Sequence, residues 1–105
     1  MNNYRIEITD VAFYDIGSIK RYIRDELKNR KAAEDIVDKF FEAIEKLETM
    51  PERHKTVGEE VISGKNGVRN IPVGNYYIFY RFIEDKSVVM IDRVLYFKRE
   101  WKNLL

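Results

Sequence analysis

The chain has 105 residues, a formal net charge of +1, one histidine and no cysteine. This length fits one domain, residues 1–105, which would bury roughly two thirds of the surface that its unfolded chain exposes. The lack of cysteine excludes disulfides, thiolate catalysis and Cys-rich zinc sites. The sequence shows no motif for a metal ion, nucleotide or other cofactor, so none is expected.

No apolar run approaches the ~20 residues that span a bilayer. Residues 1–7 carry charge inside their apolar alternation, so they match neither a signal peptide nor a lipidation site. We therefore expect a cytoplasmic protein without membrane contact. The near-zero net charge also argues against strong non-specific binding to a polyanion, which needs many contacts from Lys and Arg.

Charge is distributed unevenly along the chain. Residues 1–50 hold nine Lys/Arg and eleven Asp/Glu, whereas residues 51–105 hold ten and seven. An acidic partner is therefore expected to dock on a basic face formed by the carboxyl-terminal half.

Residues 4–9 alternate apolar and polar with period two, which predicts a half-buried strand. Thr9 or Asp10 is expected to cap a helix over residues 10–29, and apolar residues recur at helical spacing again across residues 33–49. The predicted inward stripes are Ala12, Ile16, Ile19, Ile23 and Leu27 in the first helix and Ala33, Ile36, Val37, Phe40, Ile44 and Leu47 in the second.

A short turn at residues 29–31 would make these two helices antiparallel neighbours. The second helix is expected to end at Met50–Pro51, because proline disfavours helix in the residue before it. Residues 52–66 are polar and contain glycine, so they predict a loop with one short strand around residues 57–62.

Three segments rich in β-branched and aromatic residues, 67–73, 76–83 and 88–95, are separated by turn signals at Gly74–Asn75 and residues 84–86. They predict an antiparallel meander. The whole order is β-α-α-β-β-β, an α+β fold in which a helical hairpin packs on one face of a mainly antiparallel sheet.

Two details of this meander can be predicted. Pro72 has no amide to donate, so it belongs on an edge strand or at a strand end, and its strand is expected to be short or outermost along part of its length. Alternation along residues 76–83 separates two faces. The face expected to be open carries Tyr77, Phe79, Arg81 and Ile83, and the inward face carries Tyr76, Ile78, Tyr80 and Phe82.

The last third of the chain carries a specific pattern. Its parts are Gly67-Val68-Arg69, Pro72-Val73-Gly74-Asn75-Tyr76, Ile78-Phe79-Tyr80-Arg81, and Arg93-Val94-Leu95 ahead of Arg99-Glu100-Trp101. Together with the opening strand and the paired helices, this pattern resembles the RelE/ParE toxins of type II toxin-antitoxin systems, and it is closer to the ParE branch. The resemblance implies a plasmid stabilisation-type toxin that a cognate antitoxin neutralises, that inhibits growth by binding DNA gyrase, and that ends in a short tail or helix.

A second activity occurs on the same fold, because RelE-like relatives cut messenger RNA on the ribosome. Such an endoribonuclease would use cations and an aromatic or histidine side chain on the open face of the sheet. Here Tyr77 lies where those nucleases carry arginine, and Tyr96 lies near a position of histidine or arginine, which counts against this activity. Tyrosine has an ordinary pKa near ~10, so it is a poor base at neutral pH. The candidate catalytic residues would be Arg69, Tyr77, Arg81, Arg93 and Tyr96.

Binding to a partner would use a different set of residues, and a domain that has kept the fold but lost its activity is a third possibility. The candidate partner-binding residues are Arg69, Arg81, Arg93, Lys98, Arg99 and Trp101. Arg69 could instead form a structural ion pair with the helical hairpin or Asp92, and Arg81 is more often solvated or stacked on a ring. Trp101 could equally pack back on the domain.

Other polar residues favour ordinary structural roles. The carboxylates of residues 34–48 have a helical spacing that places them with Lys39 and Lys46 on a solvated face. His54 is expected at the surface of a loop, and residues 64–67 lack the length and the hydroxyl of a phosphate-binding loop.

Overall fold

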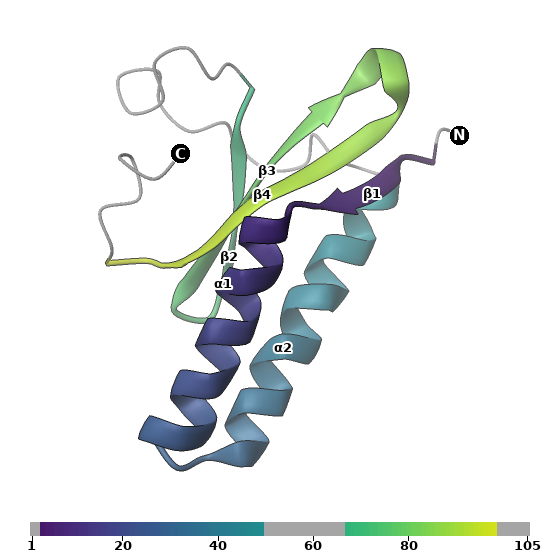
Figure 1. Cartoon of the computed structure of the whole chain (residues 1–105). Coiled ribbons are helices and arrows are strands. Elements are labelled where there is room, and N and C mark those ends of the chain that lie inside the picture. The colour runs from purple at the N-terminus through teal and green to yellow at the C-terminus, as the bar shows by residue number, and fades with distance from the viewer. Residues whose placement is uncertain (1–2, 50–66, 99–105) are drawn as a thin grey trace.

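The computed structural model describes residues 3–49 and 67–98, and Figure 1 shows two helices lying beside a sheet. In chain order the main elements are β1 (Arg5–Ile8), α1 (Asp10–Arg21), α2 (Arg30–Glu45), β2 (Arg69–Val73), β3 (Tyr76–Ile83) and β4 (Val88–Tyr96). A π-helical turn, η1 (Tyr22–Glu26), extends α1, and a 3₁₀ turn, η2 (Lys46–Glu48), extends α2, while η4 (Glu84–Lys86) joins β3 to β4. The predicted α+β fold and its element order are confirmed.

Several predictions fall on residues outside these ranges. The end of the second helix at Met50–Pro51, the loop 52–66 with its short strand, His54 and the carboxyl-terminal tail beyond residue 98 all lie outside the described residues.

The start of α1 is fixed by a threonine cap. The Thr9 hydroxyl accepts a hydrogen bond from the Ala12 amide at 3.0 Å and donates one to the Asp92 carbonyl oxygen at 3.0 Å. Because the first amides of a helix have no partner inside it, this cap satisfies one of them. The second bond ties the start of α1 to β4.

The connection between the helices differs from the prediction. Leu27 was expected in the inward stripe, but it is 56% exposed and lies beyond the end of η1. Lys28 adopts a left-handed φ of 52°, and the Asn29 side chain accepts a hydrogen bond from the Ala32 amide at 3.0 Å. Asparagine competes with the helical backbone for hydrogen bonds and favours cap positions, so α2 begins at Arg30 instead of after residue 31.

The sheet has the strand order β1-β4-β3-β2. The strand β1 runs parallel to β4, whereas β4, β3 and β2 are successively antiparallel. The strand that contains Pro72 is outermost, which is one of the two positions that its missing amide allowed.

The hydrophobic core lies between the helices and one face of the sheet. Ile78 and Tyr80 of β3 are fully buried there, together with Phe40 of α2 and Ala12 of α1. The other buried members of this cluster are Ile16, Ile44, Leu47, Ile71, Val73, Val89, Ile91 and Val94. The inward faces predicted for α2 and β3 are thus confirmed.

The opposite face of β3 is not open along its whole length. Phe79 was expected there and is 0% exposed, whereas Tyr77 and Arg81 beside it are partly exposed. The in-register neighbours of Phe79, Asn70 of β2 and Arg93 of β4, place their side chains on the same face, and the Tyr77 ring lies edge-on to the Phe79 ring at 5.9 Å between centroids. The prediction of an open face is therefore wrong at Phe79.

Candidate partner-binding surface

The strand β4 departs from regular pairing at Asp92. Phe79 pairs with Arg93, but the next residue, Tyr80, pairs with Ile91, so Asp92 is one extra residue in β4. A bulge of this kind bends a strand and redirects its side chains. The consecutive residues Asp92 and Arg93 consequently reach partners on different elements.

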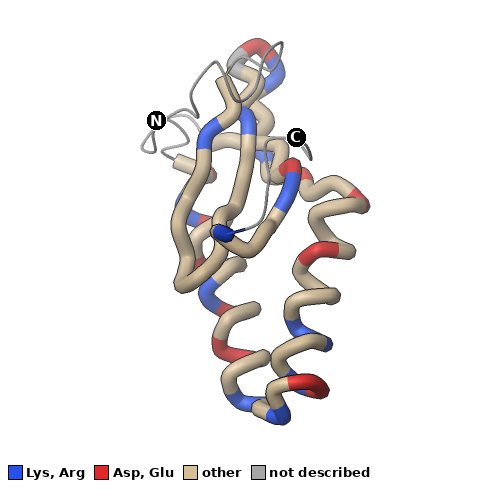
Figure 2. The backbone as a smooth tube through the Cα atoms, turned by 90° about the vertical axis from the view of Figure 1, so that its left-hand side faces the viewer, with Lys and Arg blue, Asp and Glu red and all other residues tan. Residues whose placement is uncertain are grey.

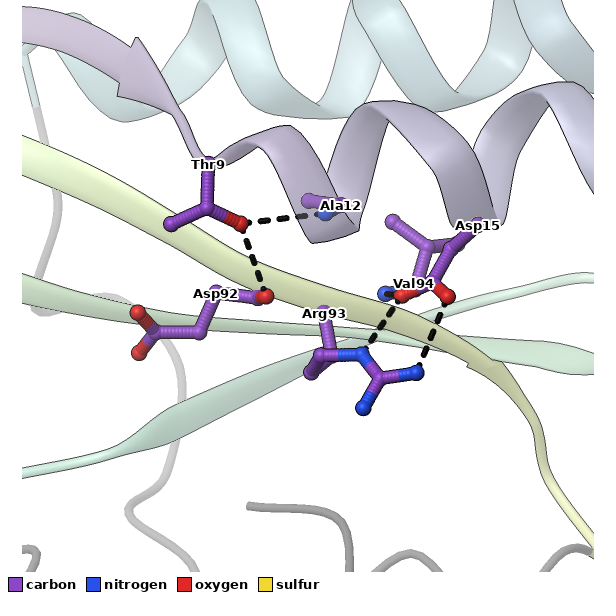
Figure 3. A network of polar contacts seen from close by, with 6 residues as sticks. All are labelled: Thr9, Ala12, Asp15, Asp92, Arg93 and Val94. Carbon is purple, nitrogen blue, oxygen red and sulfur yellow. Dashed lines mark hydrogen bonds and ion pairs between the residues drawn. The ribbon is translucent and has the colours of Figure 1, made fainter.

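Arg93 pairs with a carboxylate of α1, as Figure 3 shows. Its Nε and Nη2 donate hydrogen bonds to the Asp15 carboxylate oxygens at 2.8 and 3.0 Å, and these bonds raise the pKa of Arg93. The Val94 amide donates a third bond to Asp15 at 3.0 Å. Because the pairing with β1 ends at Ile91, Asp15 satisfies an edge amide of β4 that β1 does not reach.

Arg81 forms a second ion pair, with Asp92. Its Nε and Nη2 donate to the carboxylate oxygens at 2.7 and 2.9 Å, and the hydrogen bonding raises the pKa of Arg81. The sequence suggested a solvated or ring-stacked Arg81 and an Asp92 available to Arg69. The structure instead pairs Asp92 with Arg81, because the bulge brings the two side chains together.

Arg69 lies on the other side of the sheet from Arg81. It pairs in register with Tyr80, whose side chain is in the core, and residues directly opposite each other in a sheet share a face. Its guanidinium carbon lies 5.2 Å from the centre of the Phe82 ring, within the range of a cation–π contact. Arg69 and Arg81 therefore cannot form one continuous basic face.

The two tyrosines of the candidate nuclease site are also separated. Tyr96 pairs in register with Tyr76, whereas Tyr77 pairs with Leu95, so Tyr96 and Tyr77 point to opposite faces. Burial raises the pKa of Tyr76, and the neighbouring Tyr96 and Tyr22 raise it further. A base and an acid for one phosphate must lie within hydrogen-bonding reach of it, and this register does not bring these two tyrosines together.

The described chain ends in a small aromatic group. The rings of Tyr96 and Phe97 are 5.1 Å apart and both are partly exposed, and the Lys98 Nζ lies 5.6 Å from the centre of the Phe97 ring. Lys98 is thus placed beside exposed aromatic surface. The predicted contacts Arg99 and Trp101 lie outside the described residues.

The half-chain charge averages concealed a basic cluster at the end of the helical hairpin. Residues 20–31, which we call the hairpin tip, hold six Lys/Arg and two Asp/Glu. Figure 2 shows Lys and Arg concentrated in this part of the hairpin. Lys20, Arg24 and Arg30 line a shallow pocket of about 190 Å³ with Ala33 and Glu34. A charge count over a shorter window would have revealed this cluster.

The acidic residues of the second helix are on a solvated face, as predicted. The exposed members are Glu34, Asp35, Asp38, Glu42, Glu45 and Glu48. The described residues contain no group of three or more His, Cys, Asp or Glu side chains that could hold a metal ion. Within the same part of the chain, every helix is too short or too polar to cross a membrane.

The fold recurs in structures of toxin-antitoxin proteins. A chain of the chromosomal ParDE system from P. aeruginosa aligns with a TM-score of 0.70 at 17% identity, covering 89% of this chain and 95% of that chain. A chain of the RelBE2 toxin-antitoxin complex from Mycobacterium tuberculosis gives a TM-score of 0.61 at 20% identity, with coverages of 91% and 93%. A chain of the RelE-RelB complex from Pyrococcus horikoshii gives 0.60 at 19% identity, with coverages of 92% and 98%.

At these identities the structural likeness shows the fold alone. Comparison with curated protein sequences gives no match. The family model described as the ParE toxin of the type II toxin-antitoxin system parDE matches residues 6–101. The chain therefore belongs to the ParE toxin family, within the RelE/ParE superfamily of type II toxins.

Proposed function

We propose that this toxin inhibits growth by binding DNA gyrase in the cytoplasm, and that a cognate antitoxin of a plasmid stabilisation-type pair neutralises it. The main support is that Arg81 and Arg93, which a nuclease centre on the sheet would use, are each held by two hydrogen bonds to a carboxylate. A cation that is already paired stabilises the developing charge on a phosphate less well. The match to the ParE family model supports the same choice.

The runner-up is a ribosome-dependent endoribonuclease that cuts messenger RNA. One observation favours it: Tyr96 and Phe97 present partly exposed rings beside Lys98, an arrangement on which RNA bases could stack. The separation of Tyr77 from Tyr96 counts against it, because these side chains point to opposite faces of the sheet. A chain that has kept the toxin fold without activity would neither inhibit gyrase nor cut messenger RNA.

A growth assay separates these functions. If the toxin acts by binding, Arg99→Ala and Trp101→Ala should each weaken its binding to gyrase by roughly 2 kcal/mol or more, because charged and aromatic anchors dominate protein interfaces. Toxicity should fall accordingly. Tyr77→Phe and Tyr96→Phe should leave toxicity almost unchanged. Each variant is induced without antitoxin, and DNA synthesis and protein synthesis are followed separately, with folding checked by circular dichroism.

The opposite pattern would establish the nuclease. Loss of toxicity in the two tyrosine variants, with full toxicity in the two tail variants and cut messenger accumulating, would replace the gyrase function. Unimpaired growth on induction of the unaltered, folded toxin would favour the inactive domain.

The antitoxin is expected to bind through its carboxyl-terminal segment. That segment would lay a helix across the hairpin of residues 10–49 and an extended stretch on the sheet, reaching the face formed by residues 51–105. Exposed apolar side chains on α1 suit such a helix, since Val11, Phe13 and Tyr14 are all exposed. Deleting the segment should weaken binding at least about 100-fold, as measured by calorimetry. Unchanged affinity after this truncation would exclude the arrangement.

A further inference from the structure

The hairpin tip concentrates positive charge in a protein that is otherwise almost neutral. Its six Lys/Arg and two Asp/Glu give it a net charge of +4, against +1 for the whole chain. Among the described residues, ion pairs engage two of these six cations, Arg24 with Asp25 and Lys31 with Asp35. Most of the positive charge at the tip is therefore available to an outside partner.

Two of these cations, Arg30 and Lys31, are placed against local stability, whereas Lys20 and Arg21 lie in the last turn of α1, where cations are favoured. Arg30 and Lys31 lie in the first turn of α2, which contains no acidic residue. The amino end of a helix carries partial positive charge and prefers acidic side chains. Lys28 also adopts a left-handed φ of 52°, which side chains other than glycine rarely do. Helix stability therefore does not explain Arg30 and Lys31 in this turn, and positive charge at this position would suit an anionic partner.

The cations converge on a pocket. Lys20 of α1, Arg24 of η1 and Arg30 of α2 line this pocket. Its volume is about 190 Å³. Glu34 is the one carboxylate in its lining, so like charges face each other across a small space. A carboxylate entering this space would relieve that repulsion.

Two large side chains of the hairpin tip are exposed. Tyr22 is 54% exposed and Leu27 is 56% exposed. A nucleic acid backbone offers phosphates but no aliphatic anchor, whereas an acidic protein segment offers carboxylates and apolar side chains together. The combination at the tip fits the protein segment better.

Figures 1 and 2 show that the hairpin extends beyond the end of the sheet, with the tip at its far end. Arg81 and Arg93, which the sequence suggested as contacts, instead form ion pairs with Asp92 and Asp15 of the same domain. We propose that the hairpin tip docks an acidic segment of the protein that the toxin inhibits, with carboxylates at Lys20 and Arg30 and apolar side chains against Tyr22 and Leu27. This inference rests on the proposed function, because it assumes that the toxin acts by binding.

The test compares two charge-reversed toxins for binding to purified DNA gyrase. The tip variant is Lys20→Glu with Arg30→Glu, and the control is Lys39→Glu with Lys86→Glu, which changes the net charge equally at exposed positions away from the tip. The tip variant should bind at least about tenfold more weakly than the control at low salt. The difference should shrink as salt screens the contact. A Lys20→Gln, Arg30→Gln variant should lose less affinity, and thermal melting checks that every variant is folded.

Each outcome decides between the claims. Equal binding of gyrase by the tip variant and the control would overturn the docking site while leaving gyrase inhibition intact. Failure of the unaltered toxin to bind gyrase would overturn the proposed function and the docking site with it. A 20-base-pair duplex DNA serves as a second probe. If the tip variant lost affinity for this duplex but kept its affinity for gyrase, the tip would be a nucleic-acid contact and the inference would be wrong.

Discussion

Replacing Phe40 by alanine should lower the free energy of unfolding by about 3 to 5 kcal/mol, a large part of the stability of a domain this small. Phe40 is fully buried in the cluster between the helices and the sheet, and its ring meets the Tyr76 ring edge-on with 5.6 Å between centroids. Truncation would remove these contacts and leave a cavity that the surrounding side chains can fill only in part. Urea denaturation of the isolated chain measures the change.

The neighbouring Phe41 supplies a matched control, because it belongs to the same helix but is 40% exposed. Phe41→Ala should cost less than about 1 kcal/mol, since a partly solvated ring leaves no closed cavity. If Phe40→Ala also cost less than about 1 kcal/mol, the assignment of Phe40 to the core would be wrong.

The second large effect is expected at Asp15, whose replacement by alanine should cost about 3 to 5 kcal/mol. Asp15 is 7% exposed and holds both Arg93 and the Val94 amide. Alanine would leave the Arg93 charge without its carboxylate and an edge amide without its acceptor. Asp15→Asn keeps an oxygen for the amide but loses the charge, so it should fall between alanine and the unaltered chain.

A surface ion pair gives the contrast. Glu7 contacts Arg5 at 2.7 Å, but both side chains are largely solvated, so Glu7→Ala should cost less than about 1 kcal/mol. A double-mutant cycle between Asp15→Ala and Arg93→Ala should show coupling of about 1 to 3 kcal/mol. Equal losses for Asp15→Ala and Glu7→Ala would show that the partly buried pair of Asp15 and Arg93 does not stabilise the fold as described.

The sequence by itself determined the elements and their buried sides. Helical spacing identified Phe40 and Ala12 as inward residues, and period-two alternation placed Ile78 and Tyr80 in the core. These signals are local, because the geometry of one helix or strand sets the spacing of its apolar side chains. For the same reason the sequence limited the cap of α1 to Thr9 or Asp10, whereas the structure selected Thr9 and showed its second bond to β4.

Only the tertiary structure decided which charged side chains meet. Arg93 and Asp15 are 78 positions apart, and their contact depends on how α1 lies across β4 and on the bulge at Asp92. The same bulge places Asp92 beside Arg81, and the strand register makes Tyr77 and Tyr96 point to opposite faces of the sheet. A pattern along the chain carries no information on register or bulges, because these arise from packing between distant elements. The sequence therefore showed which residues carry charge, while the fold decided which of them pair with one another.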